Sequence, residues 1–248
     1  MGTSLPVLNA DKDGSPCSVF KLVPDGDVIL VVGPSQHKIQ VSSHFLKLIS
    51  PVLRVMLNAP MKEGEALANK CDTDGPVEIF LPEDKEQPMA QVLRTLYGSD
   101  PSTKTYPMSE VKVIAILAEK YGMVERLEIF ASFWLISAVK VRMTEVSENA
   151  WNALVVAYIL KIDWAFFSIS MAMLKTRNSL LKFVASFHDK HTGQRLGMAI
   201  EELRSTYLSQ KGTTKLEKGL CLFCFSRATD SFTRQRKECS LHDRHFYV

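Results

Sequence analysis

The sequence of 248 residues contains little cysteine, little net charge and no long uninterrupted apolar run. Its five cysteines are too few for a disulfide scaffold, and their odd number is typical of a reducing compartment. The 30 Lys and Arg against 27 Asp and Glu give a formal net charge of +3, which by itself does not indicate nucleic-acid binding. We therefore expect an intracellular protein of the cytoplasm, the nucleus or both.

Targeting and membrane-spanning segments are not expected either. The N-terminus has no basic stretch followed by an apolar one, so it does not predict a secretory signal. Residues 127–139 are apolar but too short to span a bilayer, and residues 150–172 carry Lys161 and Asp163 in their middle. Both stretches are predicted to be buried helices, and no membrane partner is expected.

Enzyme signatures are missing as well. The sequence contains no G-x-G-x-x-G, no P-loop, no G-x-S-x-G and no H-E-x-x-H motif. Hydrophobic residues make up 46% and charged residues 23%, which is ordinary for a globular protein. We therefore predict a folded protein that is not an enzyme.

Short apolar runs bounded by turn residues occupy the first third of the chain. Residues 28–32 and 38–41 are predicted to form a hairpin, and residues 77–81 a third strand. Residues 1–24 are polar and rich in turn residues, so they are predicted to be a flexible segment. Residues 58–76 contain two Pro and two Gly and are predicted to be a loop.

Helical signals follow and then dominate the sequence. Ser42-Ser43 offers an N-cap for a helix that ends before Ser50-Pro51, and Pro51 suits the first turn of the next helix. Apolar residues recur at helical spacing from Met89 to Leu96, and from Ser109 onward the pattern is helical. The predicted order is strand, strand, helix, helix, strand, helix and then further helices.

Seven segments fill this order with recognisable residues. They are Asp27–Gly33, Lys38–Ser43, Leu48–Leu53, Met61–Gly64, Val77–Asp84, Leu93–Gly98 and Leu117–Met123. By their order and spacing, residues 25–136 resemble a BTB/POZ domain of the kind found in many fungal proteins. The resemblance implies an α+β fold, with a small β-sheet capped by helices.

The rest of the chain is expected to extend this domain. Residues 137–212 resemble, by position and helicity, the all-α (BACK-like) extension that follows many BTB domains. Residues 213–248 form a separate tail in this interpretation. The family acts in protein–protein association, so the resemblance implies a protein partner, including self-association as a homodimer.

The tail carries the sharpest local pattern of the sequence. Cys221 and Cys224 form a Cys-x2-Cys pair, and 14 residues separate Cys224 from Cys239, which is followed by His242 and His245. Two close pairs of such ligands suit tetrahedral Zn²⁺, so we predict a structural zinc site with His242, or alternatively His245, as fourth ligand. The alternative is an apolar run that contains cysteine, with an unrelated Cys and His near the end of the sequence.

The tail is also basic. Residues 211–248 contain eight Lys or Arg and four Asp or Glu, a net charge of +4. One interpretation is a zinc module that contacts nucleic-acid phosphate, with Thr233–Glu238 as a recognition helix. The other, which we favour, is a solvated basic surface with Thr233–Glu238 as a loop.

Three functional hypotheses follow. The leading one is a non-enzymatic protein-interaction module that associates with itself or scaffolds a partner. The alternative is a substrate adaptor for a cullin-based ubiquitin ligase, since Met61-Lys62-Glu63 matches the hydrophobic-x-Glu triplet of cullin-binding BTB domains. There Met61 and Glu63 would contact the cullin, whereas otherwise the triplet is an exposed turn. The third is a transcription-associated regulator that uses the basic zinc tail.

Overall fold

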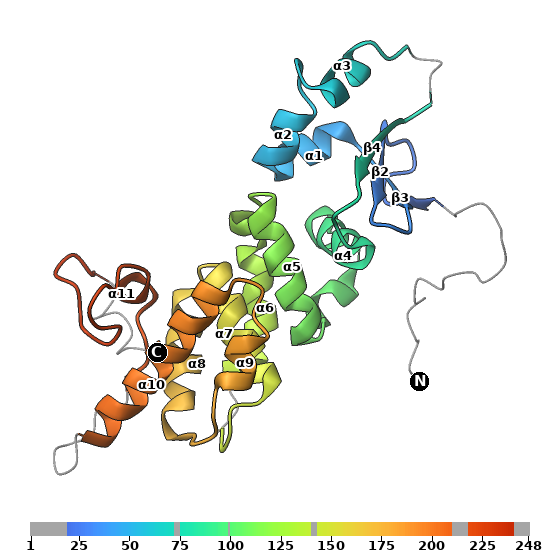
Figure 1. Cartoon of the computed structure of the whole chain (residues 1–248). Coiled ribbons are helices and arrows are strands. Elements are labelled where there is room, and N and C mark those ends of the chain that lie inside the picture. The colour runs from blue at the N-terminus through green and yellow to red at the C-terminus, as the bar shows by residue number, and fades with distance from the viewer. Residues whose placement is uncertain (1–18, 72–74, 99, 140–142, 210–217, 241–248) are drawn as a thin grey trace, which may run out of the picture. The chain divides into compact units, whose positions relative to one another are not determined.

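The computed structural model describes residues 19–71, 75–98, 100–139, 143–209 and 218–240. The chain divides into two compact units, Met1–Ala90 and Gln91–Val248 (Figure 1). The first unit holds a small four-stranded sheet, and the second is helical in its described part. The predicted α+β class is confirmed, and the domain boundaries expected at residues 24, 136 and 212 stay predictions.

The sheet is built around the β-branched run VILVV. Its strands are β1 (Phe20–Lys21), β2 (Val28–Val32), β3 (His37–Val41) and β4 (Val77–Leu81), in the order β1-β3-β2-β4. β2 and β3 pair antiparallel as the predicted hairpin, whereas β4 pairs parallel with β2 and β1 parallel with β3. β1 lies in a segment for which no strand was predicted, because two residues carry no strand pattern of their own.

Two short helices follow the hairpin and meet at a sequence-encoded corner. They are α1 (Ser43–Ile49) and α2 (Pro51–Met56). The Ser50 hydroxyl accepts a hydrogen bond from the Leu53 amide at 3.0 Å, and Pro51 occupies the first turn of α2. Cap and proline both favour a new helix at this point, so the predicted break at Ser50-Pro51 is confirmed.

The loop predicted over residues 58–76 is wrong in part. A third helix, α3 (Lys62–Ala68), lies inside it, with Glu63 and Glu65 in its first turn. Gly64 weakened the helical pattern, but the structure requires it there. A Cβ at Gly64 would lie 2.2 Å from the backbone carbon of Asn58.

The second unit packs helices around α7 (Glu148–Ile159), which is buried over almost its whole length. α5 (Met108–Lys120), α6 (Glu128–Val139) and α8 (Asp163–Ala172) all contact it. The remaining α-helices with residues in this unit are α4 (Glu86–Tyr97), which begins in the first unit, α9 (Leu181–Ala185), α10 (Lys190–Ser209) and α11 (Leu222–Ser226). Helix α11 and residues 218–240 around it are called the C-terminal segment below.

The expectation that residues 127–139 form a buried helix is wrong in part, as helix α6 shows. It was predicted to be buried, yet Ile129, Phe133 and Ile136 expose between 49% and 72% of their surface along one face. The uniform apolarity of this stretch gave no sign of which side faces the core. Among the described residues, no helix is long and apolar enough to cross a membrane.

Candidate metal centre

Three cysteine side chains meet in the C-terminal segment. The sulfurs of Cys221, Cys224 and Cys239 all lie within 4.8 Å of one another, and the side chains are almost fully buried. The Sγ atoms of Cys221 and Cys239 are 3.5 Å apart, far longer than the ~2.05 Å of a disulfide bond. The sequence prediction that these three residues come together is confirmed.

The donor set fits a soft metal ion. Tetrahedral sulfur ligation at about 2.3 Å from Zn²⁺ places neighbouring sulfurs about 3.8 Å apart, close to the separation between Cys221 and Cys239. The three thiols could therefore hold a metal ion with little movement. The predicted fourth ligand, His242 or His245, lies outside the described residues.

Burial and the neighbouring thiols raise the pKa values of Cys221 and Cys224, which favours their protonated form when no ion is bound. Burial, together with the neighbouring Cys239 and Cys224, raises the pKa of Cys221 to about 12. The pKa of Cys224 is also raised, first by burial and then by Cys239. A metal ion would bind the thiolates, so its binding must release protons from this cluster.

Local structure places the first two cysteines at one end of a short helix. Cys221 is the N-cap residue of α11, and Cys224 lies one turn further on. The Arg236 amide donates a hydrogen bond to Cys224 Sγ at 3.4 Å, and the Cys239 amide donates to the Arg236 carbonyl at 3.0 Å. The chain after Arg236 therefore turns back and brings Cys239 to the other two sulfurs.

Helix α8 holds the start of the C-terminal segment. The Leu220 amide donates to the Ser170 hydroxyl at 2.7 Å, and that hydroxyl donates to the Phe167 carbonyl at 2.9 Å. Gly219 lies so close that a Cβ there would be 1.9 Å from the Phe167 carbonyl oxygen. Only glycine permits this approach of the two backbones.

Phe225 of α11 anchors the segment in the helical core. Its buried ring contacts Tyr158 and Phe166 of the body and Phe232 of the segment, with ring centroids 5.3–5.5 Å apart. The Arg195 guanidinium of α10 lies over the Phe225 ring and donates a hydrogen bond to the Phe225 carbonyl at 2.9 Å. Packing and a charged hydrogen bond thus hold the same residue.

Glu202 of α10 binds a second point of the segment. Its carboxylate accepts hydrogen bonds from the Ser231 hydroxyl at 2.5 Å, the Thr233 hydroxyl at 2.8 Å and the Phe232 amide at 3.0 Å. Burial acts to raise the pKa of Glu202, but these hydrogen bonds outweigh it and lower the pKa. The carboxylate is therefore charged at neutral pH and fixes the loop between Cys224 and Cys239.

Three arginines of the segment have partners within the segment. Arg234 and Arg236 both pair with Asp230 at 2.6 Å, and Arg227 lies over the Phe223 ring at 3.9 Å from its centroid. Residues 233–238 form no helix. The interpretation of Thr233–Glu238 as a recognition helix is therefore wrong, and these residues form a loop.

The two candidate partner-binding residues lie in the first unit. Met61 is the N-cap residue of α3 and exposes 45% of its surface, and Glu63 is half-buried in the first turn. The triplet thus begins a helix rather than lying in an open turn. Sequence reasoning did not identify Arg195, Glu202 or Phe225, because their contacts join the C-terminal segment to helices at least 29 positions away and no local motif marks such contacts.

The comparisons with known proteins give no family. No protein-family model matches the chain, and no curated protein matches it either.

Proposed function

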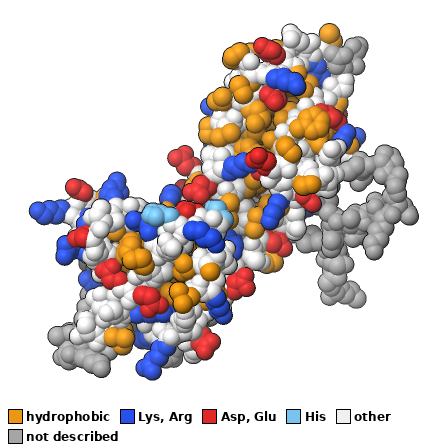
Figure 2. All heavy atoms as spheres, in the orientation of Figure 1, with side chains coloured by type: hydrophobic (Ala, Val, Ile, Leu, Met, Phe, Trp, Pro, Cys, Tyr) orange, Lys and Arg blue, Asp and Glu red, His pale blue; other side chains and the backbone are white. Residues whose placement is uncertain are grey.

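We propose that the chain is a non-enzymatic protein-interaction module of the BTB/POZ type. The observation that carries this proposal is a group of exposed apolar side chains on the packed helices α1 and α2, namely Leu48, Val52 and Val55, which are called the apolar row below. These side chains expose between 41% and 65% of their surface. In Figure 2, hydrophobic side chains gather on the visible face of the unit that carries these helices.

Such a row is costly unless a partner covers it. Contiguous exposed apolar surface on a folded protein typically marks an interaction site, whereas isolated apolar residues do not. Burying it against a second copy or another protein would contribute about 25 cal/mol for each Å² of apolar surface removed from water. The row therefore supports association, which is also what the BTB/POZ resemblance implies.

The test replaces the apolar row with charge. We expect the double substitution Val52→Lys and Val55→Lys to lower the mass of the assembled protein or to lose its co-purified partner. Phe80→Lys serves as the matched control, because Phe80 lies on β4 of the same unit and its exposure of 62% falls within the range of the apolar row. We measure the mass by light scattering and the partners by affinity purification. The same mass and the same partners for the wild type, the double variant and the control would overturn the proposal.

A second candidate function, cullin adaptor, is favoured by the exposure of Met61 at the start of α3. An exposed apolar side chain followed two residues later by an acid is what the cullin-binding triplet requires. Met61→Ala and Glu63→Ala should each reduce capture of a cullin, whereas Met198→Ala, at an exposed site of α10, should not. Equal capture by all variants would remove this candidate.

We further propose that the cysteine cluster holds a structural Zn²⁺ with His242 or His245 completing the tetrahedron. Three thiolates and one imidazole leave no open position, so the ion would cross-link the segment and not act in catalysis. Elemental analysis should find about one zinc for each chain in the purified protein. A content close to zero after purification in zinc-containing buffer would refute the site.

A further inference from the structure

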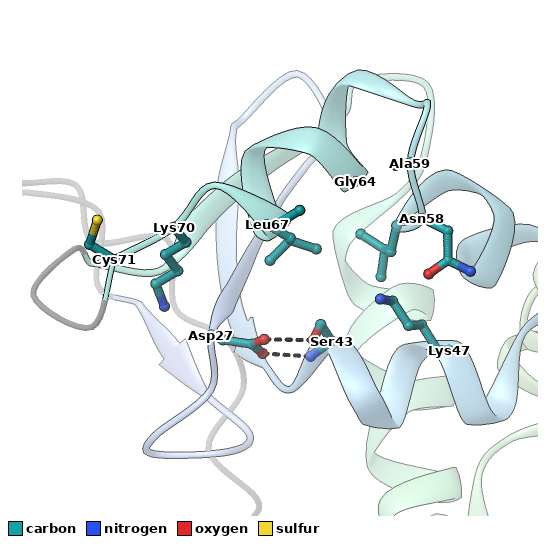
Figure 3. Close-up of a pocket in the computed structure, with 11 residues that line it drawn as sticks. Asp27, Ser43, Lys47, Asn58, Ala59, Gly64, Leu67, Lys70 and Cys71 are labelled. Atoms are coloured by element: carbon teal, nitrogen blue, oxygen red, sulfur yellow. Dashed lines mark hydrogen bonds between the residues drawn. The ribbon is translucent and has the colours of Figure 1, made fainter.

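A pocket in the first unit lies between α1 on one side and, on the other, the chain after α2 together with α3 and the two residues that follow it. Its volume is about 430 Å³, within the range of small-ligand sites. Its walls come from α1, from Leu57 to Ala59, and from α3 and the two residues Lys70 and Cys71 beyond it. Figure 3 shows Asp27 and Ser43 drawn between the two lysines of this pocket, Lys47 and Lys70.

The acidic group of the pocket is already engaged. The Asp27 carboxylate accepts hydrogen bonds from the Ser43 amide at 2.6 Å and from the Ser43 hydroxyl at 2.5 Å. Burial acts to raise the pKa of Asp27, but the two hydrogen bonds and the positive charge of Lys70 lower it overall. Asp27 thus stays charged, caps α1, and balances one of the two lysines.

Among the described residues that line the pocket, the two lysines leave a positive excess. Lys47 and Lys70 are half-buried, and within the described residues neither ammonium group forms a direct ion pair, although the charge of Lys70 acts on Asp27. Two cations against one committed carboxylate leave one positive charge for a ligand. The exposed amide side chain of Asn58 adds a donor on the same pocket.

We propose that this pocket binds a carboxylate side chain presented by an acidic peptide segment of a partner protein. Partly buried ammonium groups attract a carboxylate more strongly than fully exposed ones, because water screens them less. The pocket is lined by Gly64 and Leu67 of α3, the helix that begins after exposed Met61. A peptide seated there can therefore extend onto that apolar side chain. The choice of a peptide rests on the proposed interaction function.

The test measures binding of a defined acidic probe to the full chain. A fluorescein-labelled Gly-Glu-Glu-Glu-Gly peptide is titrated at low salt and followed by anisotropy, with its Gln counterpart and free glutarate as comparisons. Lys47→Met and Lys70→Met keep the aliphatic stem and remove the charge. Each should weaken binding about fivefold, the value of one partly exposed ion pair. Lys62→Met, on α3 but outside the pocket, is the matched control and should leave binding unchanged.

Cys71 supplies an independent readout on the same variants. It is exposed and lines the pocket, whereas Cys221, Cys224 and Cys239 are buried. Alkylation of Cys71 by anionic iodoacetate, relative to neutral iodoacetamide, should fall in Lys47→Met and Lys70→Met and not in Lys62→Met. Peptide mapping by mass spectrometry assigns the reaction to Cys71.

The outcomes separate the pocket from the proposed function. Peptide binding that the two pocket variants weaken and Lys62→Met does not would support the proposal. Equal binding by all variants, or an unchanged Cys71 reactivity ratio in both pocket variants, would overturn it. Lysine-dependent binding of glutarate without the peptide would overturn the peptide assignment. None of these outcomes depends on the apolar row, which the Val52→Lys and Val55→Lys protein tests separately.

Discussion

Phe225→Ala is expected to detach the C-terminal segment from the helical unit. The Phe225 ring is 1% exposed, contacts three other aromatic rings and lies under the Arg195 guanidinium. Removing it leaves a cavity among Tyr158, Phe166 and Phe232. The substitution therefore acts at the point where the segment enters the core.

The expected loss of stability follows from this burial. Truncating a fully buried Phe to Ala costs about 3–5 kcal/mol, which combines the lost transfer free energy with the cavity term. We expect the upper half of that range, because each aromatic pair adds about 0.5–1.5 kcal/mol beyond its buried area. A loss of about 4 kcal/mol is a large share of the 5–15 kcal/mol that stabilises a typical domain.

Urea unfolding followed by far-UV circular dichroism measures the loss, and tryptic cleavage after Arg227 reports detachment of the segment. Phe223→Ala is the matched control, because Phe223 lies on the same helix but is only partly buried, with Arg227 over its ring. It should cost about 1 kcal/mol. A loss below about 1 kcal/mol for Phe225→Ala, or equal losses in both variants, would refute the anchoring role of Phe225.

Three further substitutions test the same structure. Cys224→Ser should weaken zinc binding more than about 100-fold in a chelator competition, and an unchanged affinity would remove Cys224 from the site. The lowered pKa of Glu202 means that its contacts stabilise the fold above the unfolded pKa of about 4.3 and are lost as pH falls through the folded value. Glu202→Gln should therefore destabilise the protein at pH 7 and flatten its acid denaturation curve, whereas a parallel curve would contradict this. Gly64→Ala should lower the melting temperature, with a loss of about 1–3 kcal/mol, because its Cβ meets the Asn58 backbone. An unchanged melting temperature would mean that this backbone shifts freely.

Elements with strong local signals were predictable from the sequence. The VILVV run gives β2, the hairpin follows from the turn after Gly33, and Ser50-Pro51 sets the corner between α1 and α2. These features depend on residues close in sequence, so their pattern is enough. β1 and α3 were missed because one is stabilised only by pairing with β3 and the other contains a glycine required by a distant backbone.

The candidate site shows the same division. The spacing of Cys221, Cys224 and Cys239 predicts that they come together, because a Cys-x2-Cys pair and a later cysteine at this distance are typical of the ligands of one metal ion. The groups that hold them are not predictable in this way. Arg195 and Glu202 are ordinary charged residues of a long helix until the fold brings α11 and its following loop against them.

These contacts change what a metal ion bound at the cysteine cluster would have to do. A small zinc module that lacks a core is unfolded without its ion, because ligation supplies the folding free energy. Here Phe225, Arg195 and Glu202 hold the segment through contacts that need no metal, and two of the sulfurs already lie 3.5 Å apart. Without an ion, the remaining unfavourable contribution to folding is the close packing of three buried thiols. An ion that binds their thiolates would remove it. The metal would therefore rigidify a segment that the helical unit has already positioned, and its removal should loosen the cysteine loop before it releases Phe225.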